Sequence, residues 1–229
     1  MSRLPSWVSW GRLVSAGRGV RLRRSDGVLV GGSVLVLALV TADVAAGGLL
    51  TYLDRELRSW LAPPVDVGWA DAVGGAGDLG IAGAILAVTM LVTTQASWRL
   101  WPLVLGTGNV VAMGVAVLVL KWAVGRVGPG STVDPLGYPG HFPSGHTATS
   151  AVCIGTAVFL IVALRSGVSG ESARTWGLAV GLTVGLLVGI ASVVGDFHWM
   201  TDAVGGLLVA AIVLVAGFGL VGTTVGAGP

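Results

Sequence analysis

Long apolar runs separated by short polar segments dominate the pattern of hydrophobic and polar positions along the chain. Six of these runs come close to the ~20 residues that a helix needs to cross a bilayer. The pattern therefore predicts an all-α fold: a polytopic membrane protein whose six helices form a transmembrane bundle. The expected spans are about Val28–Leu50, Leu79–Thr94, Leu103–Leu120, Thr147–Leu164, Trp176–Val194 and Ala203–Val221.

The composition excludes several other classes of protein. Hydrophobic residues make up 54% of the 229 residues, 38 glycines add to them, and only 10% of residues are charged. An ordinary globular domain is about 25% charged. So few charges cannot cover a water-facing surface, which excludes a soluble enzyme, and the high hydrophobicity excludes a disordered chain. The single cysteine, Cys153, excludes a disulfide framework.

The basic residues indicate how the spans are oriented. Residues 1–26 carry six arginines, and Arg99, Arg165 and Arg174 fall on the same side of the predicted spans. Because cytoplasmic segments are enriched in Lys and Arg, we expect a cell-membrane protein with cytoplasmic N- and C-termini. The alternative for the basic tail is an amphipathic helix lying on anionic lipid. The expected organisation is a basic tail (1–26), a six-helix membrane domain (27–224) and a short C-terminal tail (225–229).

Two features near the first span need explanation. Asp43 lies inside the predicted span, where an acid is costly unless it is paired or near the surface. Residues 51–78 are polar and contain Trp60 and Trp69, which favours a segment lying along the interface.

Polar chemistry concentrates in two segments, 121–146 and 195–202, which the predicted orientation places together on the outer face. They contain all three histidines, His141, His146 and His198, as well as Lys121, the one lysine of the chain. Ionisable residues at helix ends that face one cavity indicate a functional site in a membrane protein. For Lys121 alone, the alternative is a side chain that extends to the interface.

Residues 143–146, Pro-Ser-Gly-His, precede and enter a predicted helix. Ser144 is expected to be the N-cap, and Gly145 permits close approach of the backbone to a ligand. Free N–H groups and the positive end of the helix dipole make such a start an anion site, where His146 could donate a proton. The alternative is a plain capped helix with an interfacial histidine.

His198 and Asp202 have the i, i+4 spacing that places two side chains on one helix face. A carboxylate that accepts the proton of one imidazole nitrogen leaves the other nitrogen free to act as a base or nucleophile. Seen alone, the pair is better explained as an ordinary surface contact. Lysine, then Pro-Ser-Gly-His, then His-x3-Asp on one membrane face is a much more specific pattern.

In these residues the sequence resembles the type-2 phosphatidic acid phosphatase superfamily of membrane lipid phosphatases. The family pattern is Lys-x6-Arg-Pro, Pro-Ser-Gly-His and Ser-Arg-x5-His-x3-Asp. The chain keeps the middle motif at 143–146, His198 and Asp202 of the third, and Lys121 and Pro129 of the first. The six-helix layout agrees with this resemblance.

Both phosphate-binding arginines of the family pattern are absent from their usual positions, which are Gly128 and Ser192 here. Arg126 is a candidate substitute. On a continuous helix, however, position 126 points about 140° away from Lys121, so Arg126 needs an irregular backbone to reach the site. Asp196 could instead pair with Arg126 and prevent the substitution.

The resemblance implies a mechanism. His198 would attack phosphorus with Asp202 orienting it, and His146 would act as general acid and then general base. The expected phosphate-binding residues are Lys121, Ser144, Gly145 and Arg126. No cofactor or metal is expected. A zinc site made of His141, His146, His198 and Asp202 is the alternative that the residue types permit.

The resemblance implies an integral membrane lipid phosphatase that hydrolyses a lipid phosphomonoester or pyrophosphate, of isoprenoid or phosphatidate type, on the extracytoplasmic face. The alternatives are a non-catalytic phospholipid-binding or accessory protein with a degraded site, and a lipid-phosphate transferase. The membrane composition disfavours a vanadate-dependent haloperoxidase. The expected partners are the lipid phosphate and the bilayer, with no nucleic acid. The oligomeric state is open. Gly181, Gly185 and Gly189, spaced four apart, predict close helix packing, within the bundle by preference and between subunits as the alternative.

Overall fold

The computed structural model describes residues 24–61, 68–129, 140–165 and 168–225. In this part of the chain all regular structure is helical, as predicted. The helices are α2 (Arg24–Ala45), α3 (Leu49–Leu61), α4 (Gly68–Gly75), α5 (Leu79–Ser97), α6 (Trp101–Val124), α7 (Gly145–Ala163), α8 (Gly170–Val194) and α9 (Met200–Val225). Nearly all of the predicted basic tail lies outside the described residues, as do residues 226–229 of the C-terminal tail.

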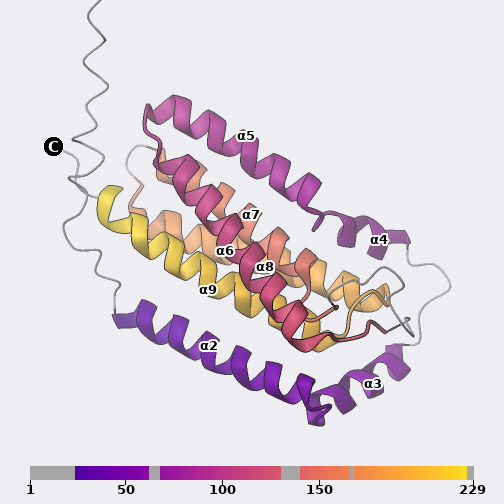
Figure 1. Ribbon diagram of the computed structural model, residues 1–229. Coiled ribbons are helices and arrows are strands. Elements are labelled where there is room, and N and C mark those ends of the chain that lie inside the picture. The colour runs from indigo at the N-terminus through magenta and orange to yellow at the C-terminus, as the bar shows by residue number, and fades with distance from the viewer. Residues whose placement is uncertain (1–23, 62–67, 130–139, 166–167, 226–229) are drawn as a thin grey trace, which may run out of the picture.

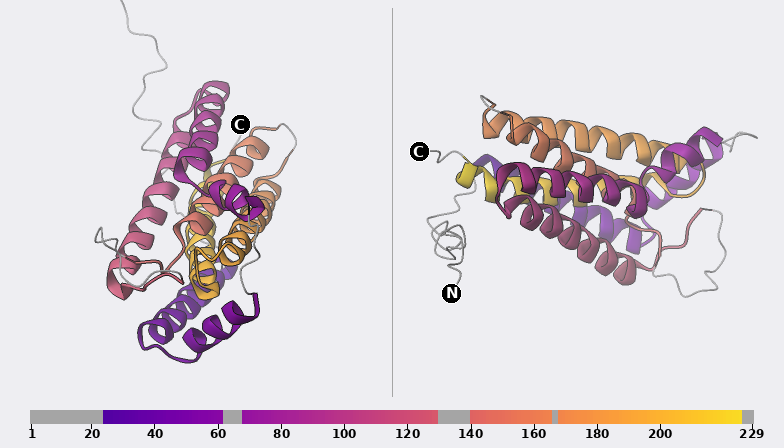
Figure 2. Two further views of the ribbon diagram at one scale, coloured as in Figure 1. Left: turned by 90° about the vertical axis from the view of Figure 1, so that its right-hand side faces the viewer. Right: turned by 90° about the horizontal axis from the view of Figure 1, so that it is seen from above.

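Six of these helices, α2 and α5 to α9, are long and apolar enough to cross a membrane. They run side by side as one elongated bundle, and the shorter α3 and α4 lie at one end of it (Figure 1). Helix α7 is the most buried of the six and α2 the least. A second view confirms that α7 and α8 lie against each other and that α2 lies on the opposite side of α9 from them (Figure 2).

The predicted first span is divided by a turn. Helix α2 ends at Ala45, five residues before the expected end, and α3 begins at Leu49. The Asp43 carboxylate accepts the backbone N–H of Leu50 at 2.8 Å, so it satisfies a free donor at the start of α3. Asp43 therefore lies at a helix junction near the end of the bundle, which explains an acid in this position.

Most of the polar stretch 51–78 is also helical. Helix α3 is strongly amphipathic, and it crosses the end of the bundle beside the start of α9 (Figure 1). Helix α4 packs against α8. The prediction of an interfacial segment did not anticipate these helices.

At the other end of the bundle, an ion pair joins α2 to α8. The Arg174 guanidinium binds the Asp26 carboxylate at 2.6 Å, and Asp26 is almost completely buried. Asp26 lies in the first turn of α2 and Arg174 is the fifth residue of α8, so the pair lies near the starts of both helices. This pair holds the peripheral α2 against the bundle at the end opposite α3.

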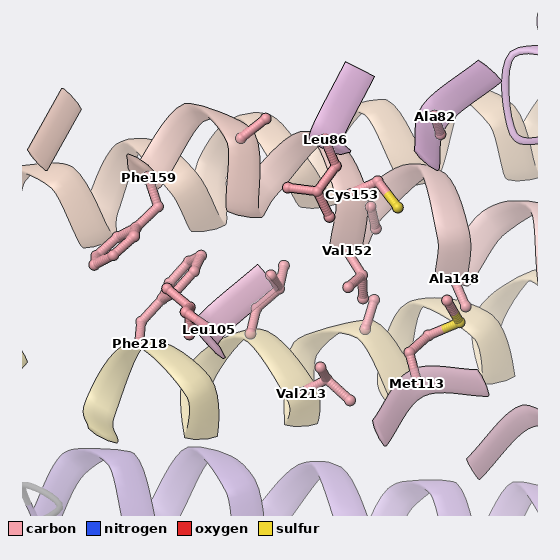
Figure 3. Packing of buried hydrophobic residues seen from close by; sticks show 14 of the residues in the cluster. Ala82, Leu86, Leu105, Met113, Ala148, Val152, Cys153, Phe159, Val213 and Phe218 are labelled. Carbon is pink, nitrogen blue, oxygen red and sulfur yellow. The ribbon is translucent and has the colours of Figure 1, made fainter. Parts of the chain in front are cut away.

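Aromatic and aliphatic side chains fill the centre of the bundle. The Phe159 and Phe218 rings stack with their centroids 4.3 Å apart, and Cys153 is buried among the apolar residues of α7 (Figure 3). Asn109 donates to the Thr156 hydroxyl at 3.0 Å, so this buried amide is paired within the bundle. This core holds α7 in place along the bundle. The position of α7 matters because the helix begins at the polar segments described below.

Glycines allow α7 and α8 to pack closely, as predicted. A Cβ atom added at Gly181 would lie 2.6 Å from the Ala151 carbonyl oxygen and 2.7 Å from the Gly155 Cα atom. A Cβ atom at Gly185 would lie 2.7 Å from the Ala151 Cβ atom. The first two of these contacts are with backbone, which cannot move aside as the end of a flexible side chain can.

We expect Gly181→Ala to destabilise the protein by about 1–3 kcal/mol, because the added methyl group forces α7 and α8 apart. Gly114→Ala on α6 is the matched control, since a Cβ atom there meets nothing within 4 Å. It should leave stability unchanged or raise it slightly through helix propensity. The measurement is the thermal unfolding midpoint of each purified variant in detergent. Equal midpoints for the two variants would contradict this packing argument.

Candidate active site

The end of α6, the start of α7 and the α8–α9 connection meet at the end of the bundle that α3 crosses (Figure 1). The Ser144 N–H, just before α7, donates to the Asp202 carbonyl oxygen at 2.9 Å. The His141 N–H donates to the Arg126 carbonyl oxygen at 2.8 Å. These backbone contacts bring together all three segments in which the sequence placed candidate site residues.

The start of α7 has the predicted cap. The Ser144 hydroxyl accepts the Thr147 N–H at 3.4 Å, and Ser144 is completely buried. Gly145 is the first residue of the helix. A Cβ atom at Gly145 would meet only one atom, Val117 Cγ1 at 4.0 Å, so packing does not require a glycine here. The N–H groups of this first turn have the orientation that favours an anion.

His198 and Asp202 contact each other, but not along one continuous helix. His198 lies two residues before α9, in the turn that follows α8, and Asp202 lies in the first turn of α9. The His198 Nδ1 atom is 3.3 Å from Asp202 Oδ2, and the Trp199 N–H donates to the same oxygen at 3.1 Å. Because the carboxylate faces Nδ1, the opposite nitrogen Nε2 is left as the proton acceptor or nucleophile.

Burial lowers the pKa of His198 below its ordinary value. The hydrogen bond and negative charge of Asp202 oppose this shift, and the positive charges of Lys121 and His141 add to it. The net direction favours the neutral imidazole, which is the form that can act as a nucleophile.

Lys121 is buried in the last turn of α6, with 4% of its surface exposed. Its ammonium group donates to the Gly140 carbonyl oxygen at 2.6 Å. The alternative of a lysine that extends to the membrane interface is therefore wrong. The charge lies inside the protein, beside the segment that leads into α7.

The chain brings Arg126 to the site through an irregular backbone, as the sequence analysis required. Gly125 ends α6 in a left-handed conformation with φ of 59°, which redirects the chain at the next residue. Arg126 Nη1 donates to Asp202 Oδ1 at 2.7 Å, and Nη2 donates to Asp54 Oδ2 at 2.6 Å. Both terminal nitrogens are thus bound to carboxylates.

Asp196 does not pair with Arg126. It binds Arg58 of α3 through two hydrogen bonds of 2.7 and 2.8 Å, and this pair is partly exposed. Arg58 and Arg126 both lie near the Trp199 ring, at 5.7 and 5.3 Å from its centroid.

The sequence analysis missed Asp54. Its carboxylate accepts the Thr201 N–H at 3.0 Å, the Thr201 hydroxyl, and Arg126 Nη2. Asp54 is 2% exposed and connects α3 to the start of α9. Residues 54–58, Asp-Arg-Glu-Leu-Arg, contain both acids and bases. This pattern does not distinguish the buried carboxylate of Asp54 from the exposed carboxylate of Glu56.

The three histidines surround the site at different distances. The His198 ring centroid is 5.6 Å from that of His141 and 6.4 Å from that of His146. Within the described residues, no group of three or more His, Cys, Asp or Glu side chains is placed to hold a metal ion. The predicted zinc alternative, which used these histidines with Asp202, therefore lacks a suitable cluster there.

A small cavity of about 10 Å³ lies beside His198, Arg58 and Asp196, under α3. It adjoins an apolar groove of about 290 Å³ between α3, α8 and α9, and the two share Leu57, Leu61, Val193, Val194 and Met200 as lining residues. The groove therefore lies next to the cavity at the histidine and follows α8 and α9, two of the helices that are long enough to cross the membrane.

Comparisons with known proteins agree with this fold. The model of the PAP2 superfamily matches residues 99–225, which is more than half of the chain. The fold is similar to the crystal structure of a transmembrane PAP2-type phosphatidylglycerolphosphate phosphatase from Bacillus subtilis, with a TM-score of 0.68 and 17% identity. That match covers 83% of this chain and 96% of the other. The sequence has no match among curated proteins.

We expect Asp54→Ala to destabilise the protein by about 3 kcal/mol, because it removes one partner of a buried ion pair and leaves the Arg126 charge less compensated. The matched control is Asp196→Asn, which breaks a partly exposed pair and should cost about 0–1 kcal/mol. Asparagine tolerates the φ of 60° at this position as aspartate does. Thermal unfolding in detergent measures both. A larger loss for Asp196→Asn than for Asp54→Ala would contradict the assignment.

Proposed function

The chain belongs to the PAP2 superfamily, and from that premise we propose that it is a membrane lipid phosphatase. The proposed reaction is hydrolysis of a lipid phosphomonoester or pyrophosphate through a phosphohistidine intermediate. One observation carries the proposal: the buried His198–Asp202 pair lies at the N-terminal end of α7, where backbone N–H groups favour an anion.

In the first step, His198 Nε2 attacks phosphorus, a P–N bond forms and the bond from phosphorus to the leaving oxygen breaks. Asp202 holds the proton on Nδ1 and stabilises the positive charge that develops on the imidazole. The contacts of Asp202 with Arg126 and with the Trp199 N–H support this role, because they hold the carboxylate in its orientation toward His198.

His146 is the proposed general acid and base. It donates a proton to the leaving oxygen of the lipid, then accepts a proton from the water that attacks the phosphohistidine. That second attack breaks the P–N bond, releases phosphate and restores His198. The exposure of His146 in the first turn of α7 supports this assignment, because a proton shuttle needs access to the leaving group and to water.

The phosphate oxygens are held, in this proposal, by the Lys121 ammonium and by the N–H groups of the first turn of α7, including that of Gly145. The Ser144 hydroxyl contributes chiefly by capping that turn. Arg126 acts as a positioning residue for Asp202 rather than as a phosphate ligand, because carboxylates occupy its terminal nitrogens. This revises the phosphate-binding role expected for Arg126.

The apolar groove beside the site supports a lipid substrate. A hydrocarbon chain lying between α3, α8 and α9 would place its headgroup next to His198. The Bacillus subtilis protein of similar fold is a phosphatidylglycerolphosphate phosphatase, so this lipid belongs in the substrate panel beside isoprenoid phosphates and phosphatidate. The distribution of arginines supports an extracytoplasmic site with both termini in the cytoplasm.

A non-catalytic phospholipid-binding protein is the second candidate. The absence of the two family arginines at Gly128 and Ser192 favours it. Ser192 is buried and donates its hydroxyl to the Val188 carbonyl oxygen at 2.8 Å, so its side chain does not extend to the site. Measured phosphate release separates the two candidates.

We expect the purified protein to release phosphate from at least one lipid of the panel, and His198→Ala to abolish this release because no nucleophile remains. His146→Ala should slow release and, with an activated leaving group, accumulate a phosphohistidine that acid-labile ³²P labelling detects. Arg55→Gln, an exposed substitution on α3, is the control and should retain full activity. Release that survives His198→Ala would exclude the mechanism, and a wild-type protein with no activity on any lipid would favour the accessory role.

The pH profile tests the state of His198. Protonation removes the lone pair that attacks phosphorus, and a lowered pKa moves this protonation to lower pH. We therefore expect the acid limb of kcat/KM to lie below about pH 6.5, the ordinary value for histidine. The second ionisation of the substrate phosphate, near pH 6, is measured separately by ³¹P NMR and divided out. An acid limb above pH 6.5 would contradict the burial argument.

A further inference from the structure

We infer that His141 supplies the phosphate contact that the family pattern assigns to an arginine at position 128. The inference rests on the proposed function, because it names a further residue of the same site. It follows from the way in which His141, Gly128 and His198 lie together.

The His141 ring occupies the space where a side chain at position 128 would begin. A Cβ atom added at Gly128 would lie 2.6 Å from His141 Nε2, 2.7 Å from Cδ2 and 2.8 Å from Cε1. The φ of Gly128 is not in the left-handed region, so the glycine is needed for space rather than for backbone conformation. The imidazole of His141 therefore occupies the space that the side chain of an arginine at position 128 would need, and we treat the two differences as one exchange.

His141 also lies beside the proposed nucleophile. Its ring centroid is 5.6 Å from that of His198, with the two rings inclined at 65°. This is closer than the 6.4 Å that separates the His198 and His146 centroids. At this separation the His141 ring is near enough to His198 for a phosphate in the proposed site to contact both rings.

The backbone around His141 is held in place from two sides. The His141 N–H donates to the Arg126 carbonyl oxygen at 2.8 Å, and the preceding Gly140 carbonyl oxygen accepts from Lys121 at 2.6 Å. Gly140 has a φ of 115°, and a Cβ atom there would lie 2.8 Å from the Arg126 nitrogen. These contacts fix the backbone that carries the His141 ring before a substrate arrives, which lowers the entropic cost of the proposed contact.

The Arg126 guanidinium is committed to Asp54 and Asp202 through both terminal nitrogens. The imidazole at position 141 carries an N–H group that can donate to a phosphate oxygen. Hydrogen bonds to charged groups are strong enough to change binding roughly 10- to 100-fold. Unlike an arginine, one imidazole nitrogen gives a single contact rather than two parallel ones.

The test compares His141→Phe with the wild-type chain in detergent. Phenylalanine keeps a ring over Gly128 but lacks N–H donors, so a role in packing alone would be preserved. We expect a folded protein with a cooperative unfolding transition, a 10- to 100-fold rise in the inhibition constant of orthovanadate, and a similar fall in kcat/KM for the lipid phosphate. Arg55→Gln is the control for loss of a distant cation and should change neither constant.

A second set of variants tests the exchange between the two positions. Gly128→Arg alone should impair activity, because the new side chain meets the His141 ring. Combining Gly128→Arg with His141→Ala removes that ring and restores a cation, so kcat/KM and orthovanadate inhibition should recover most of the loss seen for His141→Ala alone. A double variant no better than His141→Ala would contradict the exchange.

The outcomes separate this inference from the proposed function. Wild-type phosphatase activity with unchanged constants in His141→Phe overturns the role of His141 and leaves the proposed function standing. If the wild-type chain releases no phosphate from any lipid, orthovanadate binding is measured by calorimetry instead. Weaker binding by His141→Phe then supports the anion contact while the proposed catalysis fails, and equal or undetectable binding by both proteins overturns the inference.

Discussion

The buried carboxylate of Asp202 is the interaction on which the rest of the site depends. Its side chain is completely buried, and it contacts His198 Nδ1, the Trp199 N–H and the Arg126 guanidinium. Its backbone carbonyl oxygen accepts the N–H of Ser144 at the start of α7. An ionised carboxylate in such surroundings is stable only with charge compensation and hydrogen bonds. By meeting that requirement, the chain also joins the ends of α6, α7 and α9.

Charge compensation has a consequence for ligand binding. Arg126 lies between Asp54 and Asp202, so its positive charge is neutralised within the protein. The contacts of Asp54 also attach the amphipathic helix α3 to the start of α9, and α3 covers the cavity beside His198. Lys121, whose charge also acts on His198, is a point charge and not a planar fork of donors. The proposed phosphate site therefore depends more on exact placement of separate groups than on a bidentate arginine.

Close helix packing positions these groups. Glycines on α7 and α8 bring the two backbones into contact. This contact fixes the position of the start of α7 relative to the end of α8. The two helix ends carry the capped turn at Ser144 and the turn that holds His198. A similar use of small residues is found at helix interfaces in membranes, where apolar burial does not itself favour association. Packing inside the bundle and geometry at its polar end are consequently linked.

The sequence by itself determined the six apolar helices, the capped start of α7, the glycine contacts and the set of candidate residues from Lys121 to Asp202. These follow from local rules, namely hydropathy over about 20 residues, capping preference and motif spacing. Only the tertiary structure decided the partners of Arg126, the buried role of Asp54 and the placement of the His141 ring over Gly128. Each of these contacts joins segments that are far apart in the chain. Their side chains meet in an interior of low dielectric constant. Which charge compensates which is set there by distance and burial, and neither can be read from the order of residues.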